Sequence, residues 1–330
     1  MQGSVVICTR DRRRSLLRCL DSIVRSASDP RSGPVEILVV DDGSQDGTAA
    51  AVTALAAQSN VPIRLLRQAR LGLSAARNAG VADAVGDVVV FVDDDCVVSP
   101  TYLPEMFERF AADAQPVLRG GRVELGNLDD APLTIRTETG RERLARGMNP
   151  GGFILGCNMA MSRAVLKRVG TFDERFGAGS PLRSAEDTDF LLRAFLAGVA
   201  VEYDGDAMTV FHHHGRRSAV DIRKAHRAYN IGNGALMAKH VAQAPWLLRR
   251  GYWNLRNAVR ELGGGPRFDV NLGLSHGPIV WHTILGAALF IAMKARGASS
   301  RPHAGPRVKR GRHAQLDGAA LARTERGLSP

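Results

Sequence analysis

The chain has 330 residues, and its 45% hydrophobic and 23% charged residues give the balance of an ordinary globular protein, long enough for one large domain or a domain with an appendage. Its net charge is +11, and residues 296–330 hold eight Lys or Arg against two acidic residues, which is +6 of that excess. The cysteines at positions 8, 19, 96 and 157 form no CxxC pair, which argues against a zinc or redox motif and favours a reducing compartment.

Strand-like and helix-like patterns alternate through the first 92 residues, as in a parallel, doubly wound α/β sheet. The expected strands are residues 5–9, 35–40, 63–66 and 88–92, and the expected helices are residues 15–26, 48–58 and 75–84. The first apolar run, residues 4–8, is too short for the core of a signal peptide. We therefore expect a cytoplasmic amino-terminal domain.

The pattern becomes less regular after residue 100. The expected elements are a helix over 102–112, a strand over 118–124, an irregular polar loop over 127–150, a strand over 151–161, a helix over 162–169 with Ser162 as N-cap, a helix over 188–197 and a strand over 199–203. An apolar stretch then leads into three histidines, His212, His213 and His214. We place the boundary of this catalytic-type domain at residue 240.

Clustered carboxylates follow two of the expected strands. Asp41 and Asp42 follow the second, and Asp93, Asp94 and Asp95 follow the fourth. The carboxyl ends of strands are where open α/β sheets bind ligands. Three adjacent like charges favour a bound cation, and carboxylate oxygens suit Mg²⁺ or Mn²⁺ shared with substrate phosphates. A solvated acidic turn is the alternative reading of the triplet.

The carboxyl-terminal part is predicted to be mainly helical. Residues 218–262 have amphipathic helical patterns, and residues 277–293 form an apolar stretch at the short edge of transmembrane length. Residues 241–295 are expected to be a helical extension, and two readings stay open for its apolar segment 277–293: a helix associated with the inner face of the membrane, or a packed helix or oligomer contact. Residues 296–330 are predicted to be a basic disordered tail, for which no specific nucleic-acid partner is expected.

Six segments in order give the chain a resemblance to family 2 glycosyltransferases. They are Val5-Val-Ile-Cys-Thr9, Val39-Val-Asp-Asp-Gly-Ser44, residues 72–80, residues 86–95, Gly170-Thr-Phe-Asp173 and Glu186-Asp187. The resemblance covers roughly residues 4–235. It implies a GT-A nucleotide-sugar-binding fold and inverting transfer of a sugar from a nucleotide-sugar donor to an acceptor hydroxyl.

The resemblance also implies roles on the donor side. Asp42 would contact the nucleobase, and Thr9 would line the same pocket. Asp95 would bind the metal, with Asp93 or Asp94 near the ribose and metal, and alternation in an extended segment would turn Asp93 and Asp95 one way and Asp94 the other. Arg77 is either a phosphate contact or a surface helix residue.

On the acceptor side the resemblance points to Asp187 as the general base, with Glu186 positioning the acceptor. Helix capping is the structural alternative for this pair, and Asp189 is the nearest competing carboxylate. His212 or His214 would complete the metal site. Asn158 would bind sugar or stabilise a turn.

The resulting hypothesis is a Mn²⁺- or Mg²⁺-dependent inverting glycosyltransferase. UDP is the default donor nucleotide, and the acceptor is expected to be a cell-envelope, polysaccharide or lipid-linked glycan. The alternatives are a nucleotide-sugar-binding protein with a degenerate site, and a nucleotidyltransferase. A nucleotidyltransferase usually has an early glycine-rich loop, where this chain has Cys8-Thr-Arg-Asp-Arg12.

Overall fold

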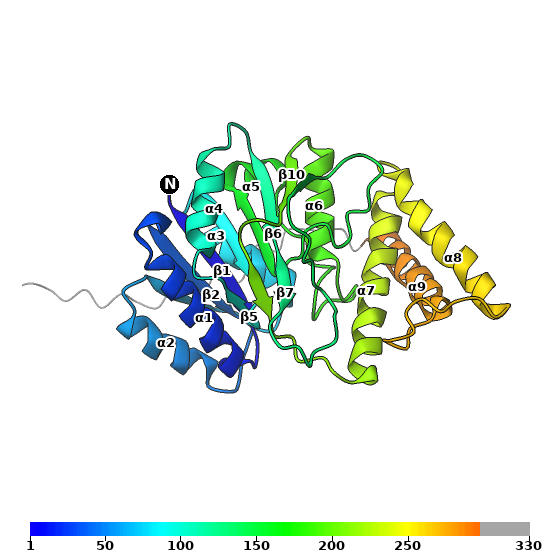
Figure 1. The fold of residues 1–330 in the computed structure, drawn as a ribbon, viewed down its shortest axis with the longest axis horizontal. Coiled ribbons are helices and arrows are strands. Elements are labelled where there is room, and N and C mark those ends of the chain that lie inside the picture. Colours follow the sequence, from blue (N-terminus) through cyan, green and yellow to red (C-terminus); the bar gives the residue numbers. More distant parts are fainter. Residues whose placement is uncertain (298–330) are drawn as a thin grey trace, which may run out of the picture.

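Buried β-branched runs form the centre of the fold in the computed structural model, which describes residues 1–297 (Figure 1). Strands β2 (Val35–Asp41) and β4 (Val88–Val92) are buried at every position, as expected where helices cover both faces of a parallel sheet. Within the described residues the main sheet has the order β3 (Ile63–Arg67), β2, β1 (Gly3–Thr9), β4, β9 (Asn158–Ser162), β6 (Val117–Gly121), β10 (Ala200–Asp204) and β8 (Arg141–Arg143). Neighbours from β3 to β4 are parallel, and β9 is antiparallel to both β4 and β6.

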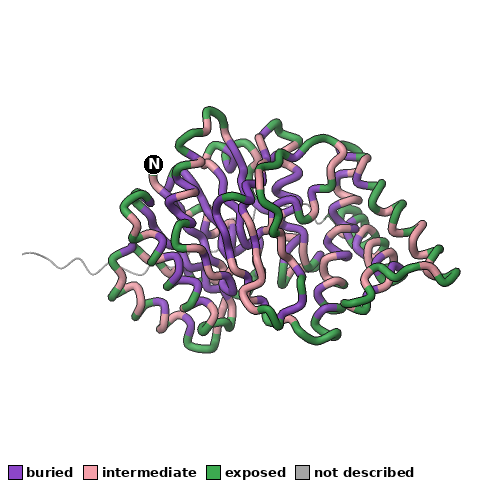
Figure 2. The backbone as a smooth tube through the Cα atoms, in the orientation of Figure 1, coloured by how far each residue is buried: buried purple, intermediate pink, exposed green. Residues whose placement is uncertain are grey.

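Alternate residues of the central strands enter two different cores. Val5 and Ile7 of β1 pack with α1 and α4 on one face, whereas Val6 packs with α3 and α6 on the other. The described helices are α1 (Arg13–Ala27), η1 (Pro30–Ser32), α2 (Thr48–Gln58), α3 (Leu73–Asp83), α4 (Tyr102–Ala111), α5 (Arg163–Val169), α6 (Glu186–Leu196), α7 (Ala219–His240), η2 (Pro245–Leu247), α8 (Leu248–Leu262) and α9 (His276–Ala295). Figure 2 shows the buried residues concentrated in the strands and the helix faces against them. The predicted α/β class and helical carboxyl-terminal region are confirmed.

A small second sheet lies beside the end of β4. Its strands are β5 (Cys96–Val98), β11 (Val210–His212) and β7 (Val123–Leu125). Strand β11 is antiparallel to β5, and the register sets His212 opposite Cys96. The histidine run is therefore brought to the aspartate triplet by main-chain pairing.

Three sequence-based boundaries were wrong. The single strand expected over 118–124 is two strands in different sheets, because Gly121 packs so closely on the backbone of residues 207–208 that a side chain there would collide. The strand expected over 151–161 begins only at Asn158, after a series of turns. The loop expected over 127–150 contains the short strand β8. Ser162 is the N-cap of α5 as expected, although its hydroxyl makes no capping hydrogen bond in the described structure.

The carboxyl-terminal helices lie at one end of the molecule, with α7 between them and the α/β body (Figure 1). A Cβ at Gly234 would lie 1.8 Å from the carbonyl oxygen of Thr283, and one at Gly286 would lie 1.9 Å from that of Ile231. Helices α7 and α9 therefore pack backbone to backbone through these glycines. Among the described residues, α9 is the one helix long and apolar enough to cross a membrane, and 17% of its apolar window is buried. The predicted domain boundary at residue 240 stays a prediction, and positions 298–330 of the predicted tail lie outside the described residues.

Candidate active site

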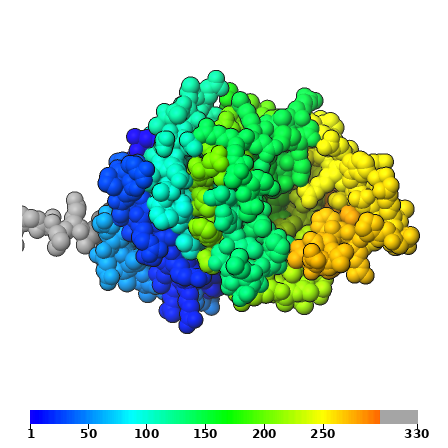
Figure 3. Space-filling view, viewed as in Figure 1, coloured from blue at the N-terminus to red at the C-terminus, as the bar shows by residue number. Residues whose placement is uncertain are grey.

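A cleft of about 730 Å³ opens where β1, β2 and β4 end. Nine of the ten predicted site residues line it: Thr9, Asp42, Arg77, Asp93, Asp94, Asp95, Glu186, Asp187 and His212. Residues widely separated in the sequence thus meet in a single cavity. Figure 3 shows the surface hollowed between the green part of the chain and the orange helix.

The aspartate triplet is a turn after β4, and Asp93 has a different partner from Asp94 and Asp95. Asp93 pairs with Arg77 at 3.4 Å. Arg12 Nη1 donates to Asp94 Oδ1 at 3.1 Å and to Asp95 Oδ2 at 2.6 Å. The expected alternation was therefore wrong, because the chain leaves the extended conformation at residue 94 and directs Asp94 and Asp95 to the same guanidinium.

The two carboxylates beside Arg12 respond differently to their surroundings. Burial raises the pKa of Asp94 to about 6 despite the Arg12 charge and a hydrogen bond from Thr9 Oγ1 of 2.7 Å. Burial also acts on Asp95, but its contacts with His212 and Arg12 outweigh this and hold its pKa well below the usual range. Asp95 is therefore the member of this pair that stays ionised most readily.

His212 and His214 do not act as a pair. His212 Nε2 lies 3.3 Å from Asp95 Oδ1, and this contact overcomes burial and raises the pKa of His212 to about 9. Both ring nitrogens of His214 contact main-chain groups. Nδ1 accepts from Arg216 N at 2.9 Å, and Nε2 lies 3.0 Å from the carbonyl oxygen of Ala131. The prediction of His214 as a metal ligand is corrected on these contacts, since neither nitrogen is free for a cation.

The residues around His212 suit a divalent cation. Ligand atoms of Asp95, Cys96 and His212 lie within 4.8 Å of one another. The Cys96 thiol has its pKa raised well above the ordinary value, chiefly by burial, so it is a poor candidate for a thiolate ligand. The carboxylate of Asp95 and the imidazole of His212 remain as the fitting donors, a mixed set compatible with Mn²⁺.

At the other side of the cleft, Asp42 fixes the segment that leads into α3. Its Oδ1 accepts from Leu71 N at 2.8 Å and from Gln68 Nε2 at 2.8 Å, and its Oδ2 accepts from Gly72 N at 3.0 Å. Asp42 thus holds the start of α3 beside the cleft. Asp41 is fully buried and accepts from Ser44 N at 2.8 Å, which fits the turn-stabilising role expected for one of the pair.

The first two residues of α6, Glu186 and Asp187, form one corner of the cleft. Asp187 Oδ2 accepts from Gly156 N at 2.9 Å, and its Oδ1 accepts from Thr188 N at 2.6 Å. Glu186 Oε1 accepts from Arg77 Nη1 at 2.8 Å. Burial, followed by the charge of Asp187, raises the pKa of Glu186 to about 7, while Arg77 opposes the shift. The residue before the helix, Ala185, has a φ of +69°, a strained backbone conformation of the kind that clusters at functional sites.

Arg77 is buried in the centre of the site and contradicts the reading as a surface helix residue. It is 1% exposed, donates to Glu186 and to the carbonyl of Gly156 at 3.2 Å, and lies 5.6 Å from the ring centroids of Phe91 and Phe172. Its guanidinium therefore links the corner at α6 to Asp93 at the end of β4.

Replacing Arg77 by methionine is expected to lower kcat by about tenfold or more, because Glu186 loses the charge that opposes its protonation. The pKa of Glu186 then moves further upward, so the acid limb of a pH–rate profile shifts to higher pH. Arg168→Met on the exposed face of α5 is the matched control. A profile identical to that of the parent chain would contradict this linkage.

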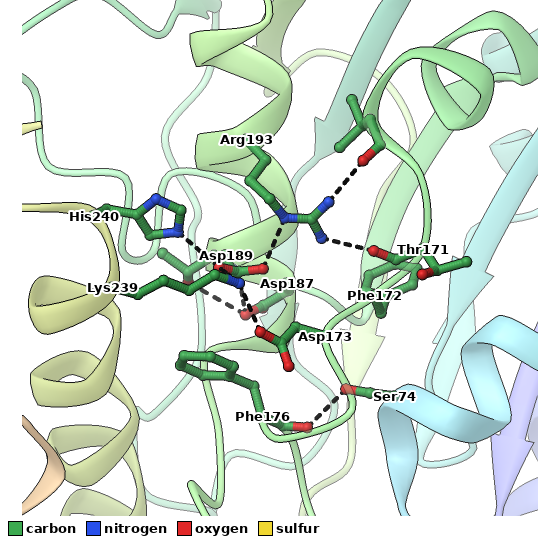
Figure 4. A network of polar contacts seen from close by, with 12 residues as sticks. Ser74, Thr171, Phe172, Asp173, Phe176, Asp187, Asp189, Arg193, Lys239 and His240 are labelled. Carbon is green, nitrogen blue, oxygen red and sulfur yellow. Dashed lines mark hydrogen bonds and ion pairs between the residues drawn. The ribbon is translucent and has the colours of Figure 1, made fainter. Parts of the chain in front are cut away.

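Asp189, the competing carboxylate, does not line the cleft but lies behind the corner that Glu186 and Asp187 form (Figure 4). It is fully buried and meets Lys239 Nζ and His240 Nε2 at 2.7 Å each and Arg193 Nε at 2.9 Å. These contacts outweigh burial and hold the pKa of Asp189 well below its usual range. Asp189 therefore anchors α6 to α7.

Asn158 is also structural. Its side chain is fully buried, accepts from the hydroxyl of Tyr102 at 2.9 Å and donates to the carbonyl of Met208 at 2.6 Å. It ties β9 to α4 and to the segment before β11, a structural role that differs from the turn stabilisation expected as the alternative.

Sequence reasoning missed every arginine of the cleft except Arg77, and three of those missed are Arg12, Arg216 and Arg250. Arg12 could have been identified from the sequence, because it follows β1 just as the aspartates follow β4. Arg216 and Arg250 come from the segment before α7 and from α8, so their meeting depends on the tertiary fold. Within residues 1–297, Arg216 Nη1 is buried without a hydrogen-bond partner.

The sequence profile of glycosyl transferase family 2 matches residues 4–170. The chain belongs to this family. Polypeptide N-acetylgalactosaminyltransferase 15 from Homo sapiens is 29% identical over 61% of this chain and 34% of the relative. Glycosyltransferase AglE from Haloferax volcanii is 24% identical over 75% of each chain. The chain spans about a third of the length of the first curated relatives that it matches.

Solved structures agree on the fold. A mannosyltransferase from Pyrobaculum calidifontis, in complex with GDP-Man and Mn²⁺, has a TM-score of 0.56 and 20% identity over 90% of this chain and 79% of that one. TarS 1-349 from S. aureus has a TM-score of 0.50 and 18% identity over 91% and 93% of the two chains. At these identities the likeness shows the glycosyltransferase fold alone.

Proposed function

We propose that this family 2 protein is a metal-dependent inverting glycosyltransferase that moves a sugar from a nucleotide sugar, with UDP as the first nucleotide to test, to a hydroxyl of a polysaccharide or lipid-linked glycan. The observation that carries the proposal is that one cleft holds the Asp94–Asp95 pair and His212 together with Asp187, so donor and acceptor machinery share a cavity. A polysaccharide-type acceptor is supported by the 38% identity with succinoglycan biosynthesis protein ExoO from Rhizobium meliloti, over 36% of this chain and 32% of the relative.

Asp95 and His212 are the residues that would hold Mn²⁺ or Mg²⁺. When bound, a divalent cation would neutralise the negative charge of the diphosphate as the bond between the sugar and the diphosphate breaks. Arg12, which pairs with both carboxylates, adds a positive charge beside the same place. Binding of a cation would require the proton on His212 to leave.

Asp187 is proposed as the base that takes the proton from the acceptor hydroxyl. Its carboxylate is fixed at the amino terminus of α6 by hydrogen bonds from Gly156 N and Thr188 N. A Cβ at Gly156 would lie 2.9 Å from Asp187 Oδ2, so the close approach that fixes the base requires glycine. Glu186 is proposed to position the acceptor from the neighbouring helix position.

The carboxyl-terminal wall of the cleft favours an acceptor that carries negative charge. Arg216 and Arg250 line it, and within residues 1–297 no ion pair is found for either guanidinium. Although Arg250 as a residue is exposed, its head group lies in the cleft, where burial lowers its pKa. A phosphate or carboxylate on the acceptor would supply the missing partner.

A panel of UDP-, GDP- and dTDP-sugars with and without Mn²⁺ tests the proposal by thermal shift. We expect one nucleotide class to raise Tm with Mn²⁺, because a ligand that binds the folded state stabilises it by mass action. In Asp95→Ala the Mn²⁺-dependent part of the shift should be lost, whereas Asp21→Ala, on the exposed face of α1, should keep it.

Transfer assays then separate the alternatives. Donor binding without transfer or donor hydrolysis would favour a nucleotide-sugar-binding protein. Release of pyrophosphate from a nucleoside triphosphate would favour a nucleotidyltransferase. Either result would overturn the proposal.

A further inference from the structure

Helix α8 presents a continuous apolar stripe to the outside of the molecule. Leu248, Tyr252, Leu255, Val259 and Leu262 recur at helical spacing and are 50%, 62%, 54%, 62% and 90% exposed. All described residues of α8 are at least partly exposed, and Figure 2 shows this helix in green and pink along its length. An apolar stripe of this length usually has a partner surface in the working protein.

Helix α9 packs against α8 and has an exposed apolar stripe of its own. Trp281, Ile284 and Ile291 share one face and are 64%, 57% and 60% exposed. The opposite face is occupied, because Gly286 packs on the backbone of α7. This packing argues against an isolated membrane-spanning helix and leaves α9 with one bare side.

The charges around the two stripes are mainly positive. Residues 248–297 contain seven Lys or Arg and two acidic residues, which gives a local net charge of +5. Arg256 lies beside the stripe with its guanidinium 4.9 Å from the ring centroid of Trp253. Arginines and aromatic side chains bordering an apolar face are the pattern of a helix that lies in the surface of an anionic bilayer. A second copy of this chain would bring the same positive charges together, so it fits less well.

We propose that α8 and α9 form a docking surface for an anionic lipid bilayer, with both helices lying in the plane of the interface. Helix α8 also borders the cleft through Arg250. At 100° per residue Arg250 lies on the side of α8 opposite to the stripe, so the helix separates the cleft from the bilayer by about one helix diameter, roughly 10 Å. Docking would bring the acceptor end of the cleft close to lipid headgroups. The docking itself does not depend on the chemistry proposed for the cleft.

Sedimentation with vesicles tests the docking surface in the full chain. We expect binding to vesicles of phosphatidylglycerol and phosphatidylcholine in equal parts, and much weaker binding to phosphatidylcholine alone, because the positive charge adds to apolar insertion. The double substitution Leu255→Glu, Val259→Glu should lower the partition onto anionic vesicles by roughly tenfold or more. Residues 298–330 are unchanged in this variant, so their basic side chains cannot account for the difference.

The matched control is Val85→Glu, Leu128→Glu, which alters two residues that are 61% and 91% exposed and belong to neither α8 nor α9. It should bind vesicles like the parent chain. Equal Tm values for the parent and both variants show that a loss of binding is not a loss of folding. No binding to anionic vesicles, resistance of bound protein to alkaline carbonate, or a dimer in sedimentation equilibrium that the Leu255→Glu, Val259→Glu variant abolishes would each overturn the proposal.

Discussion

Replacing Asp187 by asparagine is expected to lower kcat for sugar transfer by about 10²- to 10⁴-fold, the usual contribution of a general base. Asparagine has nearly the same shape, and its carbonyl oxygen still accepts the hydrogen bond from Gly156 N or Thr188 N. What is lost is the ability to take up a proton. The measurement is single-turnover transfer at saturating donor, together with the Tm shift that donor and Mn²⁺ produce.

Donor binding should survive in Asp187→Asn, since the substitution leaves Arg12, Asp95 and His212 unchanged at the donor side of the cleft. Asp221→Asn on the exposed first turn of α7 is the control and should keep full activity. Transfer by Asp187→Asn at the parental rate would show that another group takes the proton. A loss of donor-induced stabilisation would mean that the substitution disturbs the whole cleft.

Replacing Asp189 by asparagine is expected to lower the free energy of unfolding by about 3–5 kcal/mol, the usual cost of breaking a buried ion pair. The substitution leaves Lys239 facing Asp173 alone and removes the charge that Arg193 and His240 meet (Figure 4). Denaturant unfolding of the two proteins measures the difference. Asp21→Asn is the control, because its ion pair with Arg25 is exposed on both sides and worth at most about 1 kcal/mol.

The deficit in Asp189→Asn should depend on pH. The folded state holds the pKa of Asp189 below its unfolded value of about 3.9, so the stabilising effect is present above that pH and is lost as the pH falls through the folded pKa. The parent and variant should therefore differ fully near neutral pH and converge in acid. A constant difference across that range would mean that the carboxylate charge is not what stabilises the junction of α6 and α7.

The sequence was sufficient to predict the parallel strands β1 to β4 and most of the residues that line the cleft. The β-branched runs ending at Asp41 and Val92 identified central strands, and the carboxylates after them marked the edge where the cleft opens. Glu186 and Asp187 were found through the motif resemblance, and their place at the start of α6 agrees with it. These features are local, so a pattern of neighbouring residues contains the necessary information.

The features that were missed depend on contacts between distant segments. The meeting of Arg77 with Glu186 joins residues 109 positions apart, and no periodicity in α3 reveals it. The turn at Asp94 follows from contacts with Thr9 and Arg12. The separation of His214 from His212 results from the carbonyl of Ala131, which belongs to a loop that had no predicted structure. Side-chain direction in turns therefore required the tertiary structure.

The residues that line the cleft come from two consecutive parts of the chain, and Asp187 belongs to the second part. Thr9, Asp42 and the aspartate triplet all precede residue 170, within the segment that matches the family profile. Asp187, Arg216 and Arg250 follow it, and Asp189 behind them is held by α7. Under the proposed function, the residues for the donor and those for the acceptor therefore lie in two consecutive stretches of the chain. We therefore expect that exchanging residues 171–297 between members of the family changes the acceptor and keeps the donor.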